Sequence, residues 1–217
     1  MKIAGILLTI IFCCLRAEAA SIAGRVRFVG RPPGVAAQTI IYAEPLEGGH
    51  VQPGQFKMMQ KNKMFVPHVL AVPAGSTIAF PNEDLIFHNV FSQSRPNPFD
   101  LGLYRAGSSQ DRTFKTPAVY RVFCNIHPQM SAIILVVAAS HITEADSAGN
   151  YHLDLPAGRY RVTAWSEHAE AVSMELTVGS STASIPDLTL NESNVVETPH
   201  KNKFGQDYPK SAYDPKR

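Results

Sequence analysis

The stretch Cys124-Asn125-Ile126-His127-Pro128-Gln129-Met130 joins two segments that have the composition of β-strands. Residues 118–123 (Ala-Val-Tyr-Arg-Val-Phe) precede it and residues 131–137 (Ser-Ala-Ile-Ile-Leu-Val-Val) follow it, both rich in β-branched and aromatic side chains. A thiol, an imidazole and a thioether thus recur at three-residue intervals. They can converge on one atom only if the backbone curls around it, as a tight loop between two strands does. We therefore predict a metal-binding loop here.

A second histidine, His88, stands upstream, after a turn at residues 82–84. From this loop edge its imidazole can face the Cys124 loop. Two imidazoles and a thiolate with a weak axial thioether, here Met130, form the ligand set of a blue-copper electron-transfer site. The amide of Asn89 is suited to hydrogen-bond one ligand-bearing loop to the other.

Two other chemistries compete for these residues. Zinc also accepts a thiolate and two imidazoles, so the ligand set alone does not exclude it. A Cys–His nucleophile is conceivable, but it leaves Met130 and His88 without a role. Taken singly, a lone cysteine is more often a small buried hydrophobic residue than a ligand. The combination with His127 and Met130 is what favours a metal site.

The N-terminus predicts export to the periplasm or the medium. Lys2 precedes an apolar run over residues 3–15, and Ala17-Glu18-Ala19 has the pattern of a cleavage site, so residues 1–19 are predicted to be a signal peptide. The run is too short to span a bilayer as a helix, and no membrane span is expected. Cleavage would remove two of the three cysteines and leave Cys124 without an intramolecular disulfide partner.

Composition points to a globular all-β protein. The chain has 217 residues, 45% of them hydrophobic, and its net charge of +2 does not indicate nucleic acid or a membrane surface as a partner. Short β-rich runs alternate with Gly/Pro turns, and no amphipathic helix is evident. We therefore expect β-sandwiches.

Four motifs resemble the cupredoxins, in particular the plastocyanin/amicyanin branch. They are Phe80-Pro81-Asn82, His88-Asn89-Val90, the Phe114…Pro117…Tyr120 run and Cys124-x-x-His127-Pro128-x-Met130. The resemblance covers roughly residues 50–137 and implies a Greek-key β-sandwich that holds one type 1 copper ion. It implies His88, Cys124 and His127 as strong ligands and Met130 as the axial ligand.

The same resemblance implies a one-electron carrier rather than an enzyme. Electrons would leave through His127 and Pro128, within an apolar surface that includes Leu85 and Ile86, to redox donor and acceptor proteins that bind transiently. Two alternatives remain open at this point. One is copper storage or delivery with the same ligands, and the other is a docking module with a structural metal.

Residues 138–190 have a different sequence pattern from the preceding region. The Asp146-x-x-Gly149-Asn150-Tyr151 turn and residues 155–160 (Leu-Pro-Ala-Gly-Arg-Tyr) resemble the carboxypeptidase-regulatory-like, or transthyretin-like, β-sandwich, which implies a structural or docking module. Residues 20–49 are predicted to form a strand pair. It belongs either to this second sandwich, with the copper domain inserted, or to the cupredoxin as an extension.

From residue 191 to residue 217 the chain is polar, carries several lysines and lacks periodicity. We expect an extended or disordered tail that is solvated and idle, with an acidic partner for its basic residues as the alternative.

Overall fold

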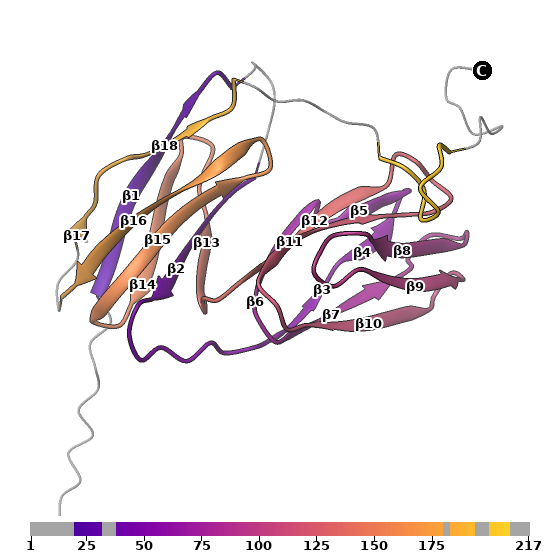
Figure 1. Ribbon diagram of the computed structural model, residues 1–217, viewed down its shortest axis with the longest axis horizontal. Helices are drawn as coiled ribbons and strands as arrows, with labels where there is room; N and C mark the ends of the chain where they lie inside the picture. The colour runs from indigo at the N-terminus through magenta and orange to yellow at the C-terminus, as the bar shows by residue number, and fades with distance from the viewer. Residues whose placement is uncertain (1–19, 32–37, 180–182, 194–199, 209–217) are drawn as a thin grey trace, which may run out of the picture.

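The computed structural model describes residues 20–31, 38–179, 183–193 and 200–208. Every regular element in these ranges is a β-strand, so the prediction of an all-β protein is confirmed. The described residues contain no helix long and apolar enough to cross a membrane. The predicted signal peptide, residues 1–19, lies outside them. The strands form two units that lie side by side (Figure 1).

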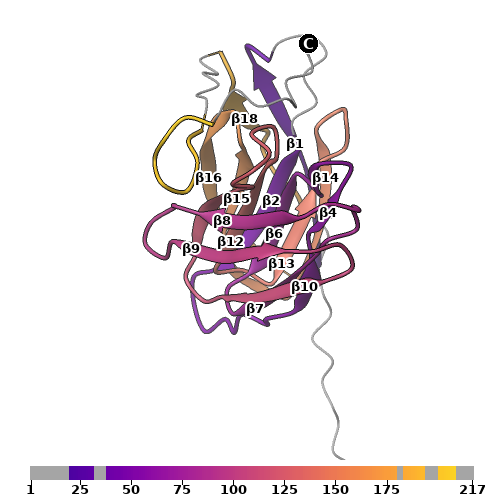
Figure 2. The same ribbon diagram turned by 90° about the vertical axis from the view of Figure 1, so that its right-hand side faces the viewer.

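The first unit is made of consecutive strands. They are β3 (Gln55–Lys57), β4 (Met59–Lys61), β5 (Met64–Val66), β6 (Val69–Pro73), β7 (Ser76–Pro81), β8 (His88–Ser92), β9 (Phe99–Tyr104), β10 (Ser109–Phe114), β11 (Ala118–Phe123) and β12 (Ser131–Val137). One sheet has the order β10-β7-β3 and the other β6-β12-β11-β8-β9, while β4 and β5 form a separate hairpin. In Figure 2 the first unit faces the viewer, and its strands β7, β8, β9 and β10 run across the picture.

Alternating side chains of the two sheets fill the core of the first unit. Ile78 and Phe80 of β7 point inward from one sheet, and Val122 of β11 and Ile134 of β12 point inward from the other, all fully buried or nearly so. Cys124 belongs to the same hydrophobic cluster. The loop over residues 124–130, the predicted metal-binding loop, therefore starts in the core of a packed sandwich.

The second unit combines strands from both ends of the chain. They are β1 (Ala20–Val29), β2 (Thr39–Pro45), β13 (His141–Glu144), β14 (Asn150–Leu155), β15 (Gly158–Ser166), β16 (Ala169–Val178), β17 (Ala183–Ser184) and β18 (Leu188–Asn191). One sheet has β1 between β14 and the short strands β17 and β18, and the other has the order β13-β2-β15-β16. Thus β1 and β2 pair with strands that follow the first unit in sequence.

Strand β12 joins the two units. Ala132, Ile134 and Val136 face the core of the first unit, whereas Ile133, Leu135 and Val137 form a second cluster together with Ile40 and Trp165 of the second unit. Both faces of β12 are covered, which explains why its sequence is a continuous apolar run instead of an alternating pattern.

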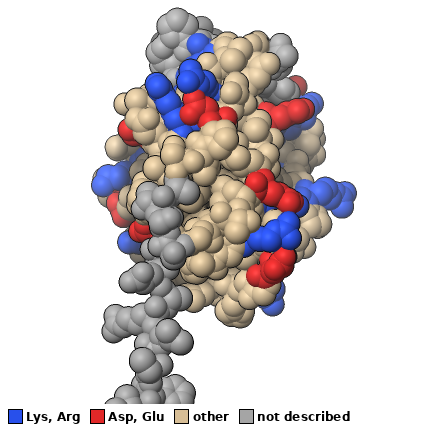
Figure 3. All heavy atoms as spheres, turned by 90° about the vertical axis from the view of Figure 1, so that its left-hand side faces the viewer, with Lys and Arg blue, Asp and Glu red and all other residues tan. Residues whose placement is uncertain are grey.

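The face that the second unit presents on the left of Figure 1 carries charges of both signs interspersed with uncharged surface (Figure 3). The second unit also has exposed ion pairs, such as Arg159 with Glu47 at 3.0 Å. Pairs of this kind contribute little to stability.

Candidate metal centre

The loop between β11 and β12 closes on itself. The Cys124 amide donates to the Met130 carbonyl at 3.2 Å, and the Met130 amide donates to the His127 carbonyl at 3.0 Å. Cys124 and Met130 are fully buried, and His127 is only 6% exposed. The loop thus directs Cys124, His127 and Met130 inward, while Ile126, Pro128 and Gln129 are exposed.

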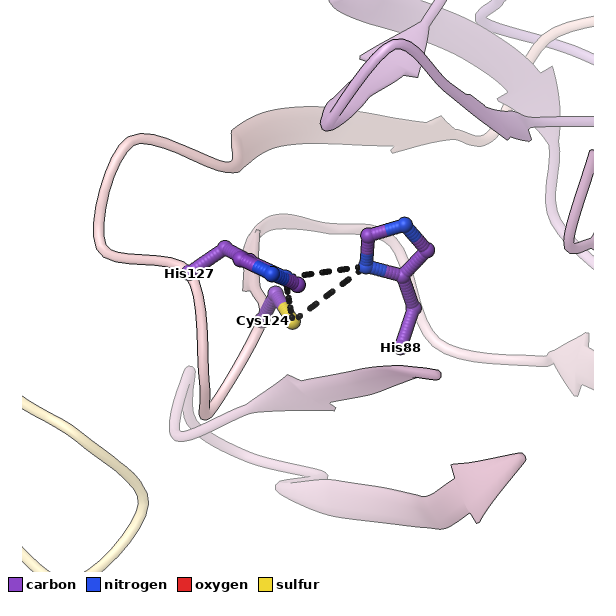
Figure 4. A group of neighbouring side chains, drawn as sticks. All are labelled: His88, Cys124 and His127. Carbon is purple, nitrogen blue, oxygen red and sulfur yellow. Dashed lines mark hydrogen bonds between the residues drawn. The ribbon is translucent and has the colours of Figure 1, made fainter. Parts of the chain in front are cut away.

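Three potential ligand atoms meet inside the first unit (Figure 4). The Nδ1 atoms of His88 and His127 lie 3.0 Å apart. The Cys124 sulfur lies 3.9 Å from Nδ1 of His88 and 3.7 Å from Nδ1 of His127. His88 is the first residue of β8, so this group combines the start of one strand with the loop that follows β11.

The spacing of the three atoms suits a single metal ion. With metal–nitrogen bonds of about 2.0 Å and a metal–sulfur bond of about 2.3 Å, a trigonal arrangement places sulfur roughly 3.7 Å from each nitrogen and the nitrogens roughly 3.5 Å apart. The two sulfur–nitrogen distances match this geometry, and the nitrogen pair is somewhat closer. The side chains need only small movements to bind an ion.

Asp84 determines which nitrogen of His88 faces the other ligands. Its Oδ2 lies 2.7 Å from Nε2 of His88. A carboxylate accepts hydrogen bonds, so Nε2 carries the proton and Nδ1 keeps its lone pair free for a metal. Asp84 is held in turn by the amides of Asn62 and Lys63, at 2.6 and 2.8 Å.

Cys124 is a buried thiol in the metal-free protein. Burial raises its pKa. Three backbone N–H groups that point at the sulfur, those of Ile126, Asn89 and His127, lower the pKa in part. The same N–H groups would stabilise a thiolate once a bound cation removes the proton.

His127 is biased toward the neutral form that a metal needs. Burial lowers its pKa, and electrostatic interactions with His88 and Lys63 lower it further. The carboxylate of Asp84 opposes this effect only in part. A neutral imidazole is the form that donates a lone pair to a metal.

Asn89 hydrogen-bonds to the loop that follows β11. Its Oδ1 accepts from the Asn125 amide at 3.3 Å, and its Nδ2 donates to Asp100 and to the Gly102 carbonyl, both at 2.7 Å. Asn89 is 2% exposed. It ties the loop after β11 to strands β8 and β9.

Large apolar side chains lie exposed near these loops. Leu85 is 96% exposed, Phe87 52% and Ile126 43%, and Ile86 is 38% exposed. They belong to the segments that lead into His88 and flank His127. Pro128 is exposed as well.

Two features of the site were missed in the sequence. Asp84 was assigned only to a turn, although its position four residues before His88 was a usable signal. The expectation of a solvated tail without specific contacts is wrong for residues 200–208, which pack against the Cys124 loop through His200, Lys203 and Tyr208. Tail contacts of this kind leave no local periodicity from which they can be predicted.

No protein-family model and no curated protein matches the chain. Among solved structures, it is similar to a copper-containing nitrite reductase from Thermus scotoductus, with 27% identity over 52% of this chain and 28% of that one and a TM-score of 0.37. A purple cupredoxin from Nitrosopumilus maritimus is 20% identical over 37% of this chain and 98% of its own, with a TM-score of 0.35. Amicyanin from Paracoccus versutus is 20% identical over 38% of this chain and 81% of its own, with a TM-score of 0.36.

Proposed function

We propose that this protein binds one copper ion through His88, Cys124 and His127, with Met130 as a weak axial ligand, and carries single electrons between redox proteins. The observation that supports the proposal is the convergence of two Nδ1 atoms and one sulfur, within 4.8 Å of one another, in a buried site. Soft sulfur and imidazole ligands favour copper, which also ranks highest in affinity among the common divalent metals.

The residues supply what an electron carrier needs. A bound copper ion would supply the one-electron chemistry. The three ligand residues are 0–6% exposed and anchored in the hydrophobic cluster and hydrogen-bond network described above, so they can keep their positions in both oxidation states. Such burial also opposes ready metal exchange, which a storage or delivery protein requires.

The exposed apolar residues Leu85, Phe87 and Ile126 support a docking surface for redox partners beside His127 and Pro128. Electron-transfer partners meet through small, transient interfaces, for which a patch of this kind is suited. The signal-like N-terminus supports a periplasmic or secreted location. We infer that the second unit, including β1 and β2, is a separate β-sandwich domain that supports or docks the copper domain.

The test is the visible and electron paramagnetic resonance spectrum of the copper-loaded protein. We expect an intense thiolate-to-copper absorption that is lost in Cys124→Ala and retained in the control His152→Ala, because His152 is exposed in the second unit. An absorption that survives Cys124→Ala would contradict the ligand assignment. A protein that retains zinc and rejects copper in competition would contradict the proposed function.

A further inference from the structure

Residues 200–208 lie against the metal-binding loop, although they follow the last strand of the second unit in sequence. Figure 1 shows this segment in yellow beside the loop that joins β11 and β12. The segment closes its own turn, because the Asn202 side chain accepts from the amides of Phe204 and Gln206 at 2.9 and 3.0 Å. Asn202 is 8% exposed.

Three hydrogen bonds connect the segment to the backbone and side chains of the loop. Tyr208 Oη donates to the Cys124 carbonyl at 2.8 Å. The Lys203 amide donates to Asn125 Oδ1 at 3.0 Å, and His200 Nε2 lies 2.7 Å from the Pro128 carbonyl, which can only accept. The contacts therefore span the loop from its first ligand to the residue after His127.

Ring contacts add to these hydrogen bonds. His200 stacks on Phe123, the last residue of β11, with ring centroids 4.0 Å apart and an interplanar angle of 22°. Tyr208 lies edge-on to His200, and its Oη is 3.2 Å from Nδ1 of His200.

The segment and Asn89 hold the same loop residue from two sides. Asn125 donates its amide to Asn89 and accepts from the Lys203 amide with its side chain. Asp100 connects Asn89 with the C-terminal segment. It accepts a hydrogen bond from Asn89 at 2.7 Å and forms an ion pair with Lys203 Nζ at 2.7 Å. The loop conformation thus depends on the C-terminal segment as well as on β8.

We propose that residues 200–208 position the metal-binding loop, with Tyr208 and His200 as positioning residues that keep Cys124 and His127 in reach of His88. The loop-positioning role stands on the contacts above, and only its effect on copper rests on the proposed function. Neither residue supplies a ligand atom. Tyr208 acts through the backbone of Cys124, and His200 acts through Pro128, the residue after His127.

The experiment compares Tyr208→Phe and His200→Phe with Tyr160→Phe in the full-length protein. Tyr208→Phe removes only the hydroxyl, and His200→Phe keeps the ring against Phe123 but loses its hydrogen bonds. Tyr160 is a matched control, because its hydroxyl also donates to a backbone carbonyl, that of Pro156 at 3.0 Å, but in the second unit.

The first readout is amide hydrogen exchange of Cys124 and Met130 in the metal-free protein, because these amides close the loop. Each test variant loses one hydrogen bond between the segment and the loop, and this loss is expected to raise the exchange rates of these amides roughly fivefold, with no change in Tyr160→Phe. The second readout is the rate of copper release to a Cu(I) chelator, expected to rise by about the same factor.

The two readouts separate the two proposals. Unchanged exchange and unchanged copper release in Tyr208→Phe and His200→Phe would overturn the positioning role. Faster exchange in a protein that gives no thiolate-to-copper absorption would support the positioning role and overturn the copper assignment. An equal increase in Tyr160→Phe would overturn the positioning role, because it would show that the effect is not specific to the segment.

Discussion

At the scale of single residues, Asp84 has the most direct influence on the site. Its burial favours a raised pKa, but hydrogen bonds from the Lys63 amide, from His88 and from the Asn62 amide outweigh it and hold the pKa below its ordinary value. The carboxylate is therefore charged at neutral pH. A negative charge on the far side of a ligand imidazole makes that ligand more basic and favours the more highly charged metal state.

Replacing Asp84 with Asn is expected to weaken Cu(II) binding about tenfold. With Cu(I) binding unchanged, a tenfold loss corresponds to a rise in reduction potential of about 60 mV. Protein-film voltammetry measures the potential, and Asp111→Asn, an exposed aspartate on β10 of the same unit, is the control. A potential that falls or does not change would contradict the role assigned to Asp84.

At the scale of elements, a buried ion pair holds the ends of β1, β15 and β18 together. Arg31, which follows β1, contacts both carboxylate oxygens of Glu192, which follows β18, at 2.6 and 2.8 Å. Ser166 at the end of β15 donates to the same carboxylate at 2.9 Å. The Glu192 side chain is fully buried, so its charge depends on these partners.

Glu192→Gln is expected to destabilise the protein by about 3 kcal/mol at neutral pH, because it leaves the partly buried guanidinium of Arg31 without its charged partner. Arg31 lowers the pKa of Glu192, burial opposes this, and Ser166 adds to the lowering. A lowered folded-state pKa means that the stabilisation is complete above the ordinary pKa of Glu and is lost as pH falls through the folded-state value.

Urea unfolding from pH 7 to pH 3 measures this effect. The difference between wild type and Glu192→Gln should shrink as the solution becomes more acidic. Glu47→Gln is the control, since Glu47 forms an ion pair with Arg159 in which both side chains are more than half exposed, and it should change little. A difference that stays constant with pH would show that the pair does not act through its charge.

At the scale of the whole molecule, the two units are joined through the outer face of β12. Trp165 and Ile40 of the second unit cover Ile133 and Leu135 of the first, and Trp165 is 8% exposed. His68 and Glu167 add an ion pair between the units at 3.1 Å. The apolar contact is expected to dominate, because His68 is half exposed.

Trp165→Ala is expected to destabilise the protein by roughly 3 to 5 kcal/mol. The two units are then expected to unfold in separate transitions instead of one. Circular dichroism reports both units, whereas the reactivity of the buried Cys124 thiol reports the first. The two probes should coincide in wild type and diverge in Trp165→Ala, while Trp165→Phe should behave nearly as wild type does. Coincident transitions in Trp165→Ala would show that the units are coupled by other contacts.

Much of the fold class was predictable from local sequence. Alternating apolar residues and Gly/Pro turns indicate short strands, because side-chain direction repeats every two residues along a strand. The loop at residues 124–130 was predictable for the same reason, since its three ligand-type side chains fall within one turn between two β-rich runs. Even β12 was recognisable as a strand, although its continuous apolar run does not reveal what covers its second face.

The sequence by itself determined the all-β character, the composition of the Cys124 loop and the order of the ligand types along the chain. Only the tertiary structure decided that Asp84 hydrogen-bonds to His88, that β1 and β2 pair with strands after residue 137, and that residues 200–208 hold the loop. These contacts join residues distant along the chain. Local periodicity carries no information about such pairs, because they form only when packed sheets bring their loops to the same end of the molecule.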